Sequence, residues 1–71
     1  MSRRRINADH EELIGQHFRF AGSISTNVVE DVHAETQGVV IAVNCLSFKP
    51  FEVDAWAVRN AIAARQAATS R

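Results

Sequence analysis

The chain has 71 residues and a formal net charge of zero, with 46% hydrophobic and 23% charged residues. This length accommodates one small domain with a modest core, and the composition is close to ordinary globular usage, which excludes global disorder. A balanced charge gives no general attraction to nucleic acid or to an anionic membrane, so any such affinity has to come from a local patch. We therefore expect no membrane partner.

The chain contains a single cysteine, which excludes an internal disulfide. No apolar run reaches the roughly 20 residues needed to span a bilayer. No apolar region follows the N-terminal arginines, as it would in a secretory signal. These features favour a cytoplasmic protein that folds in a reducing compartment.

The chain is predicted to consist of a terminal arm and one folded domain. Residues 1–6 are predicted to be a short, flexible, basic arm. A solubilising tail is the simpler interpretation of the arm, and contact with phosphate or with an acidic protein surface is the alternative. Residues 7–68 are predicted to form a single α+β domain, followed by a flexible end over residues 69–71. The arginines of the arm are Arg3, Arg4 and Arg5.

A short helix is predicted at Asn7–Gly15. Asp9 and Glu12 have the spacing of a capping box, and Gly15 is placed to end the helix. Only two strong apolar residues lie in this segment. We therefore expect the helix to cover part of a sheet, since it is too short to be stable alone.

Two alternating runs predict half-buried strands at Gln16–Ile24 and Asn27–Ala34. The turns that follow these runs are short, which favours an antiparallel meander, because a parallel pairing needs a longer crossover. In the first run the expected inward residues are Phe18, Phe20 and Ile24, and the solvated ones are His17 and Arg19. In the second run one face holds Val28, Val32 and Ala34, and the other holds Val29, Asp31 and a solvated His33.

The central strand is predicted at Val39–Leu46, which begins with β-branched residues and contains no charge. Alternation places Val39, Ile41, Val43 and Cys45 on one face, and Val40, Ala42, Leu46 and Phe48 on the other. Both faces are apolar, which is typical of a strand buried on both sides. We accordingly expect Cys45 to be a packed, unreactive thiol.

A long helix is predicted to end near Ala68. It begins near Phe51 if Pro50 occupies its first turn, or at Asp54 if that residue is the N-cap and the preceding residues are extended. The predicted fold is thus α+β: a three-stranded antiparallel sheet, a short N-terminal helix and a longer C-terminal helix packed on one face. A partly rolled, barrel-like sheet is a close variant.

The C-terminal helix has two apolar stripes. With successive residues about 100° apart, one stripe faces the sheet. It contains Phe51, Ala55, Val58 and Ile62. A helix that packs on a single sheet needs only one apolar stripe. The second stripe therefore predicts a protein interface, with tryptophan as its anchor. The alternative is that the tryptophan folds over a sheet edge. The predicted interface residues are Val53, Trp56, Ala57, Asn60, Ala63, Ala64 and Ala67.

No motif for catalysis or cofactor binding is found. The segment from His10 to Ile14 begins like a zinc-protease helix but lacks the second histidine. The three histidines and Cys45 have no metal-ligand spacing. We expect no enzyme activity, no metal, no cofactor and no small-molecule substrate.

Two functions of different class are compatible with this sequence. The first is a small protein-binding module, a regulator or inhibitor of a larger assembly, which binds a partner protein or a second copy of itself. Its size and lack of catalytic motifs are typical of accessory proteins encoded by phages or mobile elements, an analogy of style only. The alternative is a nucleic-acid-binding accessory protein that uses the sheet face and basic residues. Those residues are Arg3, Arg4, Arg5, Arg19 and Lys49.

Overall fold

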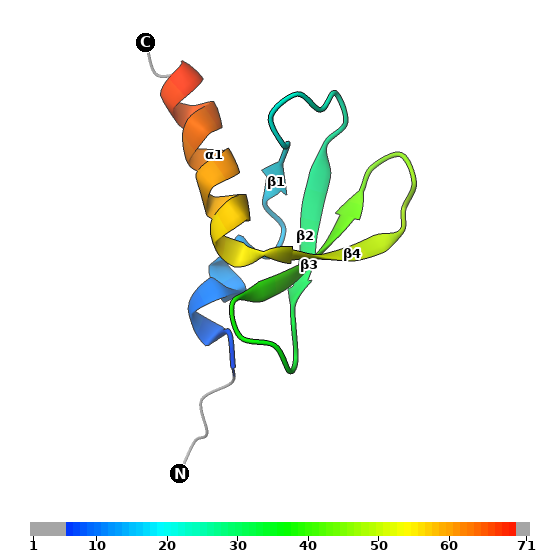
Figure 1. The fold of residues 1–71 in the computed structure, drawn as a ribbon, viewed down its shortest axis with the longest axis vertical. Coiled ribbons are helices and arrows are strands. Elements are labelled where there is room, and N and C mark those ends of the chain that lie inside the picture. Colours follow the sequence, from blue (N-terminus) through cyan, green and yellow to red (C-terminus); the bar gives the residue numbers. More distant parts are fainter. Residues whose placement is uncertain (1–5, 70–71) are drawn as a thin grey trace.

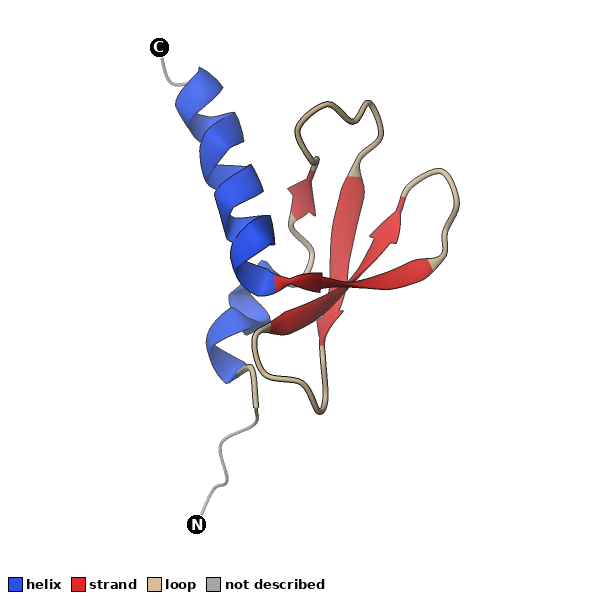
Figure 2. Cartoon of the chain, in the orientation of Figure 1, coloured by secondary structure: helices blue, strands red, loops and turns tan. Residues whose placement is uncertain are grey.

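The fold is α+β, as predicted. In this computed structural model, which describes residues 6–69, a 3₁₀ helix is followed by a sheet and a C-terminal helix (Figures 1 and 2). The arginines of the predicted arm and the last two residues lie outside the described part of the chain. The elements are η1 (Ala8–Leu13), β1 (His17–Phe18), β2 (Asn27–Val32), β3 (Val39–Asn44), β4 (Pro50–Asp54) and α1 (Ala55–Thr69).

The sheet has four strands in the order β1-β2-β3-β4, and every neighbouring pair is antiparallel. The prediction of three strands was therefore wrong, and the sheet is not closed into a barrel. The missing strand is β4, which begins at Pro50; a proline is unexpected inside a sheet because it has no N–H to donate. Ala55 N–H donates to the Gly38 carbonyl at 2.8 Å. Since bonded and non-bonded pairs alternate along an antiparallel ladder, this bond places Pro50 at a non-bonded position, where its missing N–H removes no bond to β3.

Helix α1 follows β4 without a loop. The Asp54 carboxylate accepts a hydrogen bond from Trp56 N–H at 2.8 Å, which is a capping interaction. Of the two predicted starts, the one with Asp54 as N-cap and Phe51 still extended is confirmed.

Strand β1 is much shorter than the predicted Gln16–Ile24. The chain turns at Gly22, which has a φ of 83°, and the Ser23 N–H donates to the Phe20 carbonyl at 3.0 Å. Phe18 is buried, whereas Phe20 is 38% exposed and Ile24 is 93% exposed. Phe20 still packs edge-to-face on Phe18, with ring centroids 5.3 Å apart. The predicted inward face is therefore wrong at Ile24, which follows the turn.

Strand β2 contains a β-bulge. Its register against β3 shifts between Val29 and Asp31, so Glu30 is an extra residue and the alternation changes phase. As a result Val29 and Val32 are both buried, although the simple alternation assigned them to opposite faces.

The core lies between one face of the sheet and the two helices. Its buried apolar residues are Leu13, Phe18, Val29, Val32, Val40, Ala42, Ala55 and Val58. Val39, Ile41 and Val43 point to the other face and are half-buried, so β3 is fully buried on one side only.

The end of the predicted central strand is also different. Strand β3 stops at Asn44, whose side-chain oxygen accepts hydrogen bonds from Leu46 N–H at 2.9 Å and Ser47 N–H at 3.3 Å. This local turn places Cys45, Leu46 and Phe48 in solvent. The expectation of a packed Cys45 is therefore wrong.

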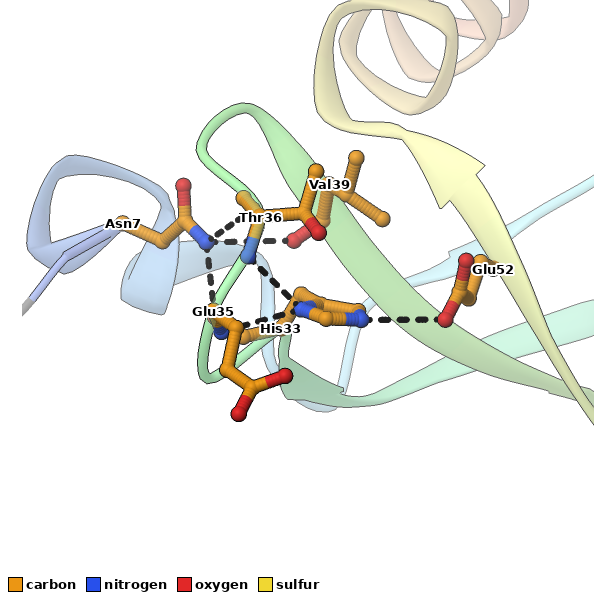
Figure 3. Close-up of polar contacts among 6 residues, drawn as sticks. All are labelled: Asn7, His33, Glu35, Thr36, Val39 and Glu52. Carbon is orange, nitrogen blue, oxygen red and sulfur yellow. Dashed lines mark hydrogen bonds and ion pairs between the residues drawn. The ribbon is translucent and has the colours of Figure 1, made fainter.

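The N-terminal segment is attached to the sheet by Asn7. Asn7 adopts the left-handed conformation (φ 66°) and is the N-cap of η1, but its side chain makes no capping bond. The predicted capping box is wrong because Asp9 lies inside η1 and not at its N-cap. The Asn7 side chain is buried and crosses to the β2–β3 turn (Figure 3). Its amide nitrogen donates to the carbonyls of His33 at 2.7 Å and Thr36 at 2.8 Å. Its oxygen accepts from Gly38 N–H at 2.6 Å.

We predict that replacing Asn7 with aspartate lowers the free energy of unfolding by about 2 kcal/mol, because two partly buried carbonyls lose their donor and face a carboxylate instead. Asn7→Gly is the control for backbone conformation, since glycine adopts the left-handed region freely. It should be destabilised as well, because the side-chain bonds are lost. Urea unfolding followed by circular dichroism measures both. An Asn7→Gly variant as stable as the wild type would show that only the conformation matters.

Candidate functional site

The predicted interface residues on α1 face solvent. Trp56, Asn60, Ala63 and Ala64 are exposed, and we call this set the outer stripe. Ala57 is half-buried at its border. The stripe is a consequence of the helical period, because Ala55 and Val58 turn toward the sheet and are fully buried.

Two predicted interface residues do not belong to the stripe. Val53 lies in β4, opposite Val40 on the inner face of the sheet, and packs against the core. This reassignment follows from the extra strand, since Val53 is not helical. The side chain of Ala67 lies outside the described part of the structure.

Trp56 belongs to this stripe and is 61% exposed. The Arg59 guanidinium lies 5.3 Å from the centroid of the indole ring, which is cation–π geometry. The His10 ring meets the same indole edge-on, with centroids 6.1 Å apart. The indole is thus held between two side chains while most of its surface contacts water. It is not folded over a sheet edge.

Arg59 is itself fixed by the N-terminal helix. Its guanidinium donates to the Glu12 carboxylate at 3.0 Å and to the Asp9 carbonyl at 2.9 Å. Its Nε donates to His10 Nδ1 at 3.3 Å. These contacts join η1 to α1 and orient both neighbours of Trp56. The i, i+3 spacing of Trp56 and Arg59 was a usable signal for their contact, whereas nothing in the sequence indicated His10.

A groove borders the other side of the outer stripe. It has a volume of about 660 Å³ and lies between α1 and the β1–β2 loop. Its apolar lining comes from Phe20, Ala57, Ala61 and Ala64. Arg19 and Arg65 also line it, and no acidic residue does. This volume is within the range of about 300–1,000 Å³ that ligand sites occupy.

The basic residues of the nucleic-acid alternative lie on different elements of the chain. Arg19 lines the groove beside Arg65, and Lys49 is exposed on the β3–β4 turn. Arg3, Arg4 and Arg5 lie outside the described residues. Carboxylates lie close to the exposed tryptophan, since Glu12 binds Arg59 and Asp54 caps the helix at Trp56.

The remaining histidines have structural or solvated positions. His33 was expected in solvent, but its Nε2 lies 2.9 Å from the Glu52 carboxylate. Its Nδ1 accepts hydrogen bonds from the backbone N–H groups of Glu35 and Thr36, at 3.0 and 2.8 Å (Figure 3). His17 is exposed, as predicted. Among residues 6–69, no group of three or more His, Cys, Asp or Glu side chains could hold a metal ion.

Comparison of the chain with models of protein families, with curated proteins and with solved structures finds no match. Within residues 6–69, no helix has the length and hydrophobicity needed to cross a membrane. The geometry of the chain is therefore the basis on which a function can be assigned to it.

We predict that Arg59→Gln increases the local motion of Trp56, because the indole loses its cationic neighbour and η1 loses its anchor on α1. Trp56 is the only tryptophan, so time-resolved fluorescence anisotropy reports on it alone. The amplitude of the fast decay should rise. Arg65→Gln is the matched control on the opposite side of α1 and should leave the decay unchanged. An unchanged decay in Arg59→Gln would contradict the proposed clamp.

Proposed function

We propose that this domain is a non-enzymatic binding module that receives a partner protein on the outer stripe of α1. The observation that carries the proposal is the presentation of Trp56. A large aromatic side chain is exposed, yet it contacts Arg59 and His10 within its own domain. A side chain that is ordered before binding loses little conformational entropy when the partner arrives.

The surroundings of Trp56 support a protein interface. Tryptophan is enriched at the energetic centres of such interfaces. Ala63 and Ala64 are exposed on the same stripe, about two helical turns further along α1, and their small side chains permit close approach of a partner helix. The bordering groove, with Phe20 in its lining, extends the apolar area.

The electrostatics favour protein over nucleic acid as the partner. Glu12 and Asp54 lie beside Trp56 and its neighbour Arg59, so the phosphates of a nucleotide whose base stacked on this indole would be repelled. Arg59 already binds the Glu12 carboxylate at 3.0 Å. A protein surface tolerates this mixture of charges, since polar rims are ordinary at protein interfaces.

The role that fits this surface is that of a small regulator or inhibitor that occupies a site on a larger assembly. A second copy of the chain is the other form of the same proposal, because an exposed apolar stripe can also pair with itself. In either case the module acts by contact.

We predict that Trp56→Ala abolishes association and leaves the domain folded, with a stability loss of about 1 kcal/mol or less, since most of the indole is exposed. Ala64→Arg should also block association, because it adds a long charged side chain to the stripe. Loss of a central anchor weakens binding by about 30-fold or more. Gln37→Arg is the control, an exposed position on the β2–β3 turn.

Light scattering over a concentration series, in low and high salt, shows first whether the wild type forms dimers. Cross-linked partners are then captured from the source cells with the wild type and the three variants. Loss of the dimer or the partner in Trp56→Ala and Ala64→Arg, with retention in Gln37→Arg, is the expected result. Unfolding of Trp56→Ala, or full retention in both stripe variants, would contradict the proposal.

A further inference from the structure

A second exposed apolar surface lies at one end of the sheet. Ile24 is 93% exposed, Leu46 73% and Phe48 75%, and we call these three residues the loop-tip cluster. Ile24 is in the β1–β2 loop and the other two are in the β3–β4 turn. Both connections lie at the end of the sheet opposite the β2–β3 turn (Figure 1). Three large apolar side chains this exposed, at one end of so small a domain, require an explanation.

The two connections are tied together at their bases. The Asn44 amide donates to the Ser25 hydroxyl and to the Asn27 side-chain oxygen, both at 2.9 Å. Cys45 N–H donates to the Thr26 carbonyl at 3.0 Å. The two turns that carry the loop-tip cluster are therefore joined by a backbone hydrogen bond.

Phe48 is also held in an unfavourable conformation. Its φ is 60°, a region that residues with a Cβ rarely adopt. Its N–H donates to the Asn44 carbonyl at 2.9 Å, which closes the turn. Strain of this kind concentrates at functional sites, and here it accompanies a bulky side chain in solvent.

The two loops that carry the loop-tip cluster contain basic residues and no acidic ones. The segments 19–26 and 45–49 contain Arg19 and Lys49 and no acidic residue. Arg65 lines the groove against the first of these segments. The acidic residues lie on other parts of the chain: Asp9, Glu11, Glu12, Glu30, Asp31, Glu35, Glu52 and Asp54. A chain with zero net charge thus has a local patch that is basic and apolar.

We propose that this end of the sheet binds an anionic lipid surface. Ile24, Leu46 and Phe48 enter the boundary between headgroups and acyl chains, while Arg19 and Lys49 face the lipid phosphates. Protruding turn tips favour lipid over a protein partner, because a bilayer surface accepts a convex apolar tip without a matching pocket. The expectation of no membrane partner rested on net charge, which does not describe this patch.

The test is flotation of the full chain with vesicles of phosphatidylcholine alone and of phosphatidylcholine mixed with phosphatidylglycerol. The wild type should float with the anionic vesicles and much less with the neutral ones. The double variant Leu46→Ser, Phe48→Asn should bind about tenfold more weakly, and asparagine tolerates the left-handed conformation at position 48. Lys49→Glu should weaken binding by about fivefold or more.

Two controls separate this site from the rest of the molecule. Ile14→Ser removes an apolar side chain that is 43% exposed at the end of η1, and it should bind vesicles like the wild type. Trp56→Ala should also bind vesicles normally, so this proposal and the proposed function succeed or fail separately. Circular dichroism confirms that each variant is folded.

Failure of the wild type to float with anionic vesicles would overturn the proposal, as would unchanged flotation of the double variant. Equal loss of flotation in Ile14→Ser would indicate non-specific adhesion and would overturn it too. If the wild type does not float and the double variant instead loses a protein partner, the loop-tip cluster is a protein interface.

Discussion

The direct passage of β4 into α1 is the constraint on which the rest of this small structure depends. Asp54 ends the strand and Ala55 begins the helix. Ala55 is fully buried, and its N–H is bonded to the carbonyl of Gly38. Because no loop separates β4 from α1, the direction of the helix is set by the edge strand of the sheet. The rotation of the helix is set by burial of Ala55 and Val58, and this places Trp56 outward.

The outer stripe and the loop-tip cluster occupy different parts of the molecule. The outer stripe runs along α1, whereas the loop-tip cluster lies at the end of the sheet. Attachment to lipid through the loops would therefore leave the helix accessible from the side. A module of this kind could hold a partner protein at an anionic surface without any chemistry of its own.

Regular periodicity was the part of the sequence that predicted structure well. It identified α1, its buried and exposed sides, and the start of β3. Prediction failed where a residue acts through distant partners or local backbone geometry. The bulge at Glu30 and the left-handed Asn7 depend on pairing across the sheet and on the β2–β3 turn. Pro50 is tolerated in β4 because its nitrogen points away from β3, where no ladder bond is needed. The direction of that nitrogen depends on the strand register, which the sequence does not show. Trp56 lies on a helix face that periodicity predicts. Its neighbour His10 comes from η1, 46 residues earlier, and no local pattern predicts that contact.

The edges of this sheet limit how copies of the chain can assemble. One edge is β1, which is two residues long. The other is β4, where Pro50 lacks an N–H and Glu52 and Asp54 bring negative charge. Two such strands side by side would place like charges together, an arrangement that opposes continuous sheet growth and aggregation. Edge-to-edge pairing of the sheet is therefore disfavoured, and contacts between copies of the chain are expected to use its side-chain surfaces.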